Sequence, residues 1–392
     1  MIDITKLYCG SSTFADGLRY GEKSENNYFK QERSARERKP IVVWNITRTC
    51  NLSCIHCYSN SENIVYHDEL NHSQALKVID NLAEYGVPAV LFSGGEPLIR
   101  KDIFELADYT RSKNLKFVLS TNGTLITKSL AKKIKETGFS YVGISLDGIG
   151  SVNDTFRGAR GAFEKTMNAF RLLKEQNQRV GLRMTLTKNN INELEAIFDF
   201  IETEKIDRAC FYHLVYAGRG DKTADITKNE SRNAIEIILK RTKDYKNRGL
   251  DINILTVDNH VDGVYIYLKL LKDAPEQAKG VYEKLIWNGG GMYSSGVGIG
   301  AIDPEGNVHP DQFWQHYNLG NIKDRNFSEI WQDTSDPVLK GLKNRKHLLK
   351  GKCSRCKWVD LCGGSLRVRA DLFYNDPWME DPACYLTEEE IS

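Results

Sequence analysis

Between residues 40 and 220 the sequence alternates six times between an apolar strand pattern and an amphipathic helix pattern. The strand patterns are continuously apolar, which is typical of parallel strands buried on both faces. Such an alternation builds a parallel sheet covered by helices. The sequence therefore predicts an α/β fold, a partial (β/α)6 TIM-like barrel. Its expected strands lie within 41–47, 88–95, 116–123, 141–148, 179–187 and 208–220.

The remainder of the chain divides around this barrel. The polar and highly charged stretch 21–38 predicts a flexible or surface segment. The motif GVGIGAIDPEGNVHP predicts a β-hairpin that turns at 304–307. We expect four regions: an N-terminal extension (1–39, partly flexible), the barrel (40–225), a helical connecting region (226–290) and a loop-rich C-terminal domain that bears cysteines (291–392).

The overall charge excludes some classes of partner. The chain has 392 residues, with 54 basic and 52 acidic side chains and a formal net charge of +2, so no global field favours nucleic acid or a membrane. No apolar run is long enough to span a bilayer, and the first residues lack the basic and apolar regions of a signal peptide. These features predict a cytoplasmic protein without nucleic-acid or membrane partners.

Seven of the nine cysteines fall into two groups, which in a reducing compartment indicates metal binding or redox chemistry. Cys50, Cys54 and Cys57 form a C-x3-C-x2-C motif without a fourth cysteine nearby. A closed zinc site that uses His56 is one interpretation. The other is an iron–sulfur cluster with one open corner, where a substrate or cofactor binds.

The second group supplies four thiolates. Its spacing is compatible with a structural zinc ion and with a fully ligated iron–sulfur cluster. The members are Cys353, Cys356, Cys362 and Cys384.

Polar segments follow the first four expected strands: TRTCNLSC, SGGEP, STNGT and SLDG. In parallel barrels the chemistry takes place at the carboxyl ends of the strands, so we expect one site to collect these loops. In SGGEP, Gly94 and Gly95 allow close approach of the backbone, and Glu96 can hold an ammonium group. An ordinary glycine-rich turn is the alternative.

The three cysteines after the first strand, together with GGEP at 94–97, resemble the radical S-adenosylmethionine superfamily. The resemblance implies a [4Fe–4S] cluster on Cys50, Cys54 and Cys57 whose unique iron is chelated by S-adenosylmethionine. It also implies a 5′-deoxyadenosyl radical as the reactive species. Glu96 then holds the methionyl ammonium, and His56 stands where the family usually has an aromatic residue beside the adenine.

Three further strand-end residues match positions that contact S-adenosylmethionine in this family. Asn122 and Ser145 are candidates for the ribose or the carboxylate, and Arg183 is a candidate for the carboxylate. A structural role is the alternative for each.

The C-terminal cysteine pattern resembles the SPASM or twitch extension of the same superfamily, which carries auxiliary iron–sulfur clusters. Four cysteines fill one cluster, and HPDQFW at 309–314 replaces the PC motif of members with two auxiliary clusters. The resemblance thus implies one auxiliary [4Fe–4S] cluster, suited to electron transfer.

Further motifs, among them FYHLVYAGRGD, GNVHPDQFWQHYNLGNI and NDPWMEDPACYLTEEEI, resemble a subfamily that acts on modified iron tetrapyrroles. This likeness implies removal of acetate side chains from 12,18-didecarboxysirohaem to give Fe-coproporphyrin III, with an electron donor such as ferredoxin or flavodoxin. Conversion of the same precursor toward haem d1 is the first alternative. A peptide-modifying maturase and a non-catalytic metal-binding module are the others.

A tetrapyrrole with acetate and propionate groups needs basic partners. Candidates for the carboxylates are Arg219, Arg367 and Arg369, and candidates for an axial iron ligand or proton donor are His213, His309 and His316. Surface arginines and structural histidines are the alternative interpretations.

Overall fold

The computed structural model describes residues 1–11, 19–21 and 35–392. Most of the stretch 21–38, which the sequence predicts to be flexible or exposed, lies outside the described residues.

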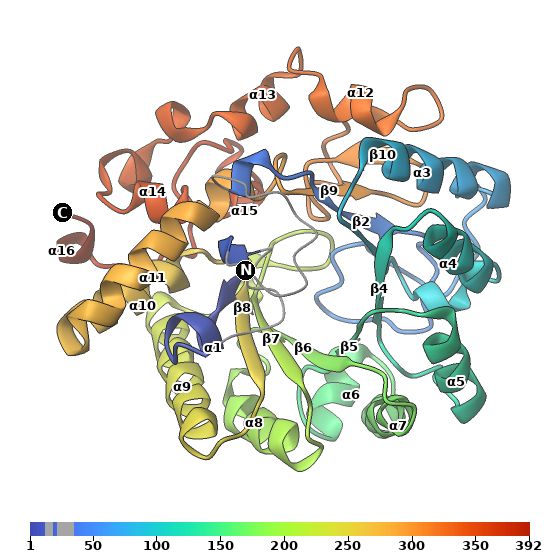
Figure 1. Cartoon of the computed structure of the whole chain (residues 1–392), viewed down its shortest axis with the longest axis horizontal. Coiled ribbons are helices and arrows are strands. Elements are labelled where there is room, and N and C mark those ends of the chain that lie inside the picture. Colours follow the sequence, from blue (N-terminus) through green and yellow to red (C-terminus); the bar gives the residue numbers. More distant parts are fainter. Residues whose placement is uncertain (12–18, 22–34) are drawn as a thin grey trace.

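The described strands form one eleven-stranded sheet in the order β1-β8-β7-β6-β5-β4-β3-β2-β9-β10-β11. All six predicted barrel strands are present as β2 to β7, and neighbours among them pair in parallel. Figure 1 shows this part of the sheet curved around the centre of the molecule with helices outside it. The strands are β1 (Ile2–Asp3), β2 (Ile41–Asn45), β3 (Ala89–Ser93), β4 (Lys116–Thr121), β5 (Val142–Ser145), β6 (Val180–Leu186), β7 (Arg208–His213), β8 (Asn253–Val257), β9 (Ile299–Ile302), β10 (Asn307–His309) and β11 (Gly320–Asn321).

The helices that cover the barrel follow the predicted segments. They are α3 (His72–Tyr85), α4 (Ile103–Ser112), α5 (Lys128–Thr137), α7 (Ala162–Glu175), α8 (Leu194–Thr203) and α9 (Lys228–Asn247). Asn71 caps the first of them, because its side chain accepts a hydrogen bond from the Gln74 amide. Gly86, in the left-handed conformation, terminates this helix.

Between residues 40 and 290, one strand and one α-helix were not anticipated. Residues 226–290 contain the expected helices α9, α10 (Val261–Asp273) and α11 (Pro275–Asn288), but strand β8 lies among them and pairs in parallel with β7. The short helix α6 (Ser151–Arg157) follows β5. Both are brief segments beside long helices, where periodicity gives little signal. Strand β8 in turn pairs with β1, and α1 (Ile4–Leu7) packs against β8 and α9.

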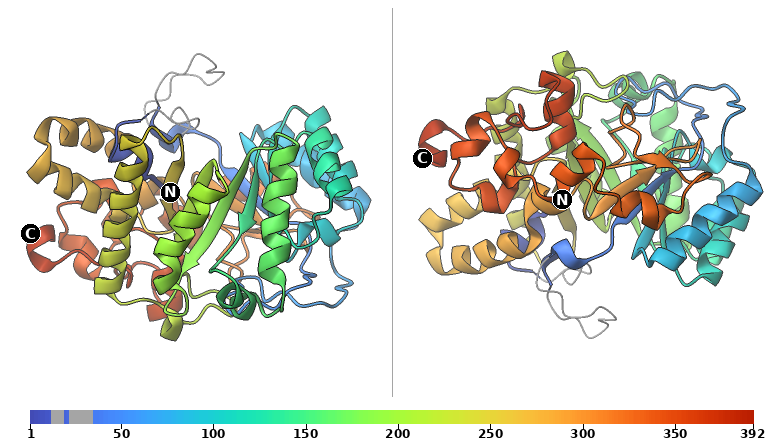
Figure 2. Two further views of the ribbon diagram at one scale, coloured as in Figure 1. Left: turned by 90° about the horizontal axis from the view of Figure 1, so that it is seen from below. Right: turned by 90° about the horizontal axis from the view of Figure 1, so that it is seen from above.

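The C-terminal part continues the sheet beyond β2. Strand β9 pairs in parallel with β2 and then forms the predicted hairpin with β10. Figure 2 shows the gold helices α10 and α11 beside the red C-terminal segments, in agreement with their contacts with α14. The last helices are α12 (Phe327–Gln332), α13 (Pro337–Lys343), α14 (Val359–Cys362), α15 (Arg367–Tyr374) and α16 (Glu388–Ile391).

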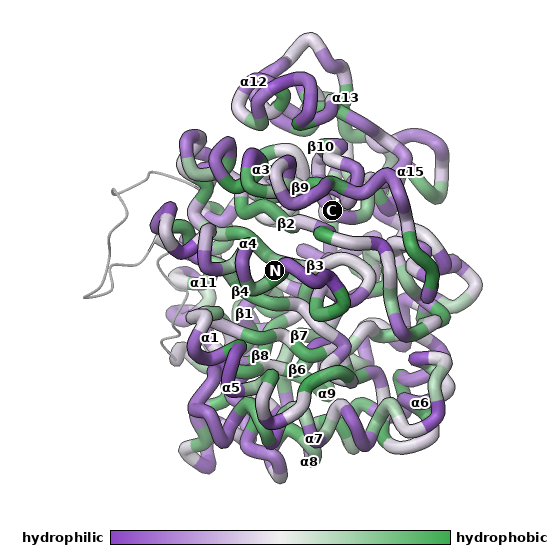
Figure 3. The backbone as a smooth tube through the Cα atoms, turned by 90° about the vertical axis from the view of Figure 1, so that its right-hand side faces the viewer, coloured by the Kyte–Doolittle hydropathy of each residue, from purple (hydrophilic) through white to green (hydrophobic). Residues whose placement is uncertain are grey.

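The apolar residues gather inside this arrangement. The strands β4, β6 and β8 run through a hydrophobic interior, while the outer helix α5 carries hydrophilic segments (Figure 3). None of the helices in the described part of the chain is long and apolar enough to cross a membrane.

Candidate active site

The loops that follow β2 and β3 are bonded closely to each other at the carboxyl edge of the sheet. The amide of Gly95 donates to the Thr47 carbonyl (2.7 Å), and the amide of Glu96 donates to the Thr49 carbonyl (2.9 Å). A Cβ atom on Gly95 would lie 2.3 Å from the Thr49 oxygen, and one on Gly94 (φ +139°) would lie 2.3 Å from the Thr47 oxygen. The two glycines are therefore needed for this approach, as the motif indicates.

Glu96 is fully buried at this junction. Its carboxylate accepts hydrogen bonds from the Leu98 amide (3.1 Å), the Thr121 hydroxyl (2.8 Å) and the Asn122 amide (2.8 Å). Burial raises the pKa of Glu96 to about 7, although these hydrogen bonds act in the opposite direction. The carboxylate is thus held in one position, where a cationic group would stabilise its ionised form.

Asn122 connects this carboxylate to the first cysteine group. Its side-chain Nδ2 donates to Asn51 Oδ1 (3.0 Å) and lies 4.0 Å from the sulfur of Cys50. Its amide bonds to Glu96. Three residues predicted from separate loops, Cys50, Glu96 and Asn122, therefore belong to one hydrogen-bonded group.

Cys50, Cys54 and Cys57 pack together with Leu52 and Ala159 in a small apolar cluster. Polar groups face each sulfur: the Leu52 amide lies 3.4 Å from Cys50 Sγ, Arg157 Nη1 lies 3.6 Å from Cys54 Sγ, and the Ser59 hydroxyl lies 3.4 Å from Cys57 Sγ. Such donors stabilise thiolate ligands.

The three thiols differ in acidity. Burial raises the pKa of Cys50 to about 12 and also raises that of Cys54. Burial acts in the same direction on Cys57, but hydrogen bonds from Ser59 and Ser61 and the nearby charge of Arg219 outweigh it and lower its pKa. Three neighbouring sulfurs with polar donors directed at them are a donor set that fits an iron–sulfur cluster.

Arg157 and Asp147 complete the surroundings of Cys54, and neither was identified from the sequence. Both side chains are buried, and Arg157 bonds to the Asp147 carboxylate as well as to the Cys54 sulfur. Asp147 also accepts a hydrogen bond from the Thr185 amide (2.7 Å). The SLDG motif marked this loop, but the sequence interpretation selected Ser145 in it, and Arg157 lies on the unpredicted helix α6.

We expect Arg157→Met to lower the free energy of unfolding by about 3 to 5 kcal/mol, because it leaves the Asp147 carboxylate buried without a counterion. Urea unfolding of the reconstituted protein, followed by circular dichroism, measures this loss. Arg171→Met is the matched control: it removes an ion pair with Glu204 in which the arginine side chain is 55% exposed, and it should cost less than about 1 kcal/mol. Equal losses in the two variants would contradict the interpretation.

The remaining candidates for a cofactor lie nearby. Ser145 and Arg183 are register partners on β5 and β6. Arg183 bonds to the Ser120 hydroxyl, and its guanidinium lies 5.8 Å from the centre of the Tyr212 ring. The His56 ring packs on Phe156 with ring centres 4.5 Å apart, and burial lowers the pKa of His56 to about 4. His56 therefore presents a flat, neutral ring within the cysteine loop.

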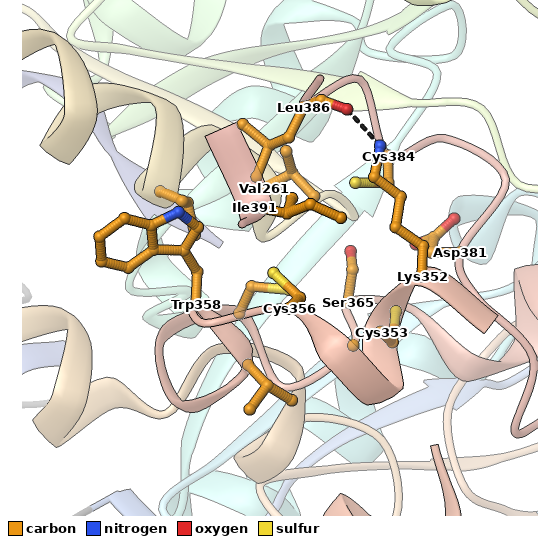
Figure 4. A pocket seen from close by; sticks show the side chains of 14 residues that line it. Val261, Lys352, Cys353, Cys356, Trp358, Ser365, Asp381, Cys384, Leu386 and Ile391 are labelled. Carbon is orange, nitrogen blue, oxygen red and sulfur yellow. Dashed lines mark hydrogen bonds between the residues drawn. The ribbon is translucent and has the colours of Figure 1, made fainter. Parts of the chain in front are cut away.

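The second cysteine group lines a pocket between α10 and the C-terminal segments. Its walls include Val261, Trp358, Leu386 and Ile391, and all four cysteines of the group, Cys353, Cys356, Cys362 and Cys384, contribute to it. Figure 4 shows Cys353 and Cys356 from one short segment and Cys384 from another around this space.

Burial raises the pKa of each of these four thiols. At Cys362 the other three thiols raise it further, as expected where like charges are close. In the described residues no three Cys, His, Asp or Glu side chains converge as one metal ion requires. A cubane cluster has a different requirement, because each thiolate binds a separate iron atom. The four thiols therefore fit a fully ligated cluster.

The arginines considered for a substrate are engaged within the protein. Arg367 donates to the backbone carbonyls of Pro377, Met379 and Gly364. Arg369 pairs with Asp381 (2.9 Å) and donates to two further backbone carbonyls. Both are fully buried, so the hypothesis that they bind substrate carboxylates is wrong. Arg219 also bonds to backbone carbonyls, those of the cysteine loop.

The three histidines differ in the burial of their side chains and in the partners of their ring nitrogens. His213 pairs with buried Asp262 (3.0 Å), and both ring nitrogens of His309 have partners. His316 is 40% exposed, bonds through Nε2 to Asp371 (2.7 Å) and stacks on Trp314. Trp314 packs against residues that directly follow β7, so His316 lies near the carboxyl edge of the barrel.

Comparison with known families and proteins places this geometry in context. Residues 44–201 match the family model of the radical SAM superfamily, and residues 298–357 match that of SPASM, an iron–sulfur cluster-binding domain. The chain is 52% identical to the Fe-coproporphyrin III synthase of Methanosarcina barkeri, over 100% of this chain and 99% of that protein. It is 41% identical to the Pre-heme d1 synthase of Dinoroseobacter shibae, over 90% of this chain and 87% of that protein.

A solved structure shares the fold. The crystal structure of Streptococcus suis SuiB bound to S-adenosylmethionine superposes with a TM-score of 0.67 at 20% identity, over 88% of this chain and 77% of that chain.

Proposed function

Because this chain belongs to the radical S-adenosylmethionine superfamily, we propose that it removes the acetate side chains of 12,18-didecarboxysirohaem to give Fe-coproporphyrin III. The observation that carries this proposal is the 52% identity to an Fe-coproporphyrin III synthase over nearly the full length of both chains. The 41% identity to a Pre-heme d1 synthase supports the second candidate, conversion of the same precursor toward haem d1.

The enzyme uses S-adenosylmethionine and iron–sulfur clusters, as its two domain types imply. When bound, these cofactors supply a reducing electron and the ability to abstract a hydrogen atom from carbon. Cys50, Cys54 and Cys57 hold the first cluster and leave one corner for S-adenosylmethionine. Glu96 holds the methionyl ammonium, and the flat ring of His56 lies beside the adenine.

The protein positions these groups in a buried setting. The close approach at Gly94 and Gly95 places the Glu96 carboxylate beside the cysteine loop, where low polarity strengthens its attraction for an ammonium group. Asn122, Ser145 and Arg183 are proposed to contact the ribose or the carboxylate. The four C-terminal cysteines hold one auxiliary cluster, which carries electrons between the substrate and a ferredoxin or flavodoxin.

The pKa of Glu96 gives the binding of S-adenosylmethionine a pH dependence. An ammonium group binds the ionised carboxylate, which is lost as the pH falls through about 7. We expect the affinity for S-adenosylmethionine to fall about eightfold from about pH 7.5 to about pH 6. Isothermal titration under anaerobic conditions measures it. Glu96→Gln, which cannot titrate, should bind weakly at both pH values; an unchanged pH profile in this variant would refute the role of Glu96.

His316 is the histidine whose surroundings suit an axial iron ligand. Asp371 on one ring nitrogen orients the imidazole, so that the other ring nitrogen can serve as the ligand. We expect His316→Ala to change the absorption and electron paramagnetic resonance spectra of bound ferric Fe-coproporphyrin III. His72→Ala is the matched control, because His72 is 45% exposed, pairs with Asp102 and is the first residue of α3. Identical spectra for the wild type and His316→Ala would exclude this ligand.

The product of the reaction tests the function itself. Reduced enzyme is incubated anaerobically with S-adenosylmethionine and 12,18-didecarboxysirohaem, and the tetrapyrrole is identified by mass. Fe-coproporphyrin III is the expected product. A different modified tetrapyrrole would support the haem d1 alternative, and an unchanged tetrapyrrole beside active cleavage of S-adenosylmethionine would point to another substrate class, such as a peptide.

A further inference from the structure

The segment 214–221, which follows β7 and is here called the β7 loop, reaches across the barrel to the cysteine loop. The amide of Arg219 donates to the Cys57 carbonyl (2.9 Å). Its side chain donates through Nε to the Cys54 carbonyl (2.9 Å) and through Nη1 to the Ser61 carbonyl (3.0 Å). In the sheet, four strands separate β7 from β2. These bonds therefore join two loops that follow strands far apart in the barrel.

The backbone of the β7 loop is shaped for this contact. Gly218 has φ +60°, and a Cβ atom at this position would lie 2.3 Å from the Cys57 oxygen and 2.5 Å from the Tyr58 oxygen. Only glycine permits both the conformation and the distance. The backbone of the β7 loop is therefore in direct contact with the backbone of Cys57, whose thiol is a proposed cluster ligand.

The C-terminal part of the chain holds the β7 loop from its other side. Arg369 donates to the Leu214 carbonyl (2.9 Å), and Val215 and Ala217 pack in an apolar cluster with Trp314. The Tyr216 ring lies 6.0 Å from that of Phe373 on α15. The loop thus bridges the C-terminal domain and the cysteine loop.

One donor of Arg219 has no partner. Its Nη2 is buried and makes no hydrogen bond within the described part of the chain. A buried guanidinium nitrogen without an acceptor is costly unless a bound group supplies one. A group bound in the cysteine loop is a candidate for this acceptor, because Nε and Nη1 of the same side chain already bond to that loop.

We propose that Arg219 is a positioning residue for the radical-generating cluster: it fixes the backbone that carries Cys54 and Cys57 and places a positive charge against that loop. The proposal depends on the assignment of these cysteines as cluster ligands and not on the identity of the tetrapyrrole. A positive charge favours the more negative, reduced form of a cluster, so loss of Arg219 should make the cluster harder to reduce.

The test compares Arg219→Ala and Arg219→Lys with the wild type. Arg111→Ala is the matched control, since Arg111 also donates to backbone carbonyls, those of Glu136 and Thr137, far from the cysteines in sequence. The first readout is hydrogen exchange of amides 54–61 in anaerobically reconstituted protein without S-adenosylmethionine or tetrapyrrole. The second is the electron paramagnetic resonance signal and midpoint potential of each reduced cluster.

In Arg219→Ala we expect exchange at 54–61 to be about tenfold faster, with unchanged exchange at 353–362. The electron paramagnetic resonance signal of the first cluster should shift and its midpoint potential should fall. The signal and the potential of the auxiliary cluster should stay unchanged. Added methylguanidine should restore part of the signal in Arg219→Ala, and Arg219→Lys should restore the potential more than the exchange protection. Wild-type exchange and spectra in Arg219→Ala, or equal changes at both clusters, would overturn the proposal. Since neither readout uses the tetrapyrrole, failure of the proposed reaction leaves this result intact.

Discussion

Replacement of Cys54 by alanine is expected to reduce the formation of 5′-deoxyadenosine from S-adenosylmethionine to background. The first cysteine group offers three thiolates in the described structure, so loss of one leaves too few ligands to retain the cluster. Cys54 is also the sulfur that Arg157 faces, so its removal leaves that buried guanidinium with one partner fewer. Chromatography of the nucleoside products under anaerobic, reducing conditions measures the effect.

The iron content provides the second measurement on Cys54→Ala. Wild-type protein should hold about eight irons per chain and the variant about four, because the C-terminal cluster persists. Cys9→Ala is the control, since Cys9 lies outside both cysteine groups and should leave iron and activity unchanged. Retained cleavage of S-adenosylmethionine in Cys54→Ala would rule out the assignment of this site.

Replacement of Cys362 by alanine should have the complementary effect. Cys362 shares a pocket with three other thiols, and its pKa is raised by burial and by their charges. Bound iron offsets the repulsion between these thiolates. Loss of one of the four ligands should prevent the cluster from forming and lower the iron content by about four per chain. We expect formation of the deacetylated tetrapyrrole to stop while cleavage of S-adenosylmethionine continues without coupling to it.

Metal analysis decides the outcome for this second site. Iron and zinc are quantified in the wild type and in Cys362→Ala, and the tetrapyrrole product is measured in the same preparations. Stoichiometric zinc with about four irons in the wild type would establish the structural-zinc alternative and refute the auxiliary cluster. Full deacetylation by Cys362→Ala would show that the auxiliary cluster is not needed for the reaction.

The two cysteine groups differ in a way that matches these expectations. The first has three thiols beside a buried carboxylate that is suited to an ammonium group. The second has four thiols in a pocket whose other walls are largely apolar. An open site accepts a cofactor that brings its own ligands, whereas a closed site is suited to electron transfer.

Much of the fold could be predicted from local patterns. The six strands β2 to β7 and the hairpin of β9 and β10 are confirmed, because apolar runs and turn residues report on neighbours close in sequence. The same holds for the gathering of Cys50, Glu96 and Asn122, since parallel strands bring their carboxyl ends to one edge. Strand β8 and helix α6 were missed because they are too short to show a period.

The sequence by itself determined the six barrel strands, the two cysteine groups and the glycine-dependent turn before Glu96, all of which depend on spacing along the chain. The tertiary structure alone decided what the arginines do. Arg219 bonds to Cys54 across 165 residues, and Arg369 bonds to Leu214 across 155. A guanidinium side chain is compatible with a surface, a substrate or a buried carbonyl, and only the folded chain shows which acceptors lie within its reach.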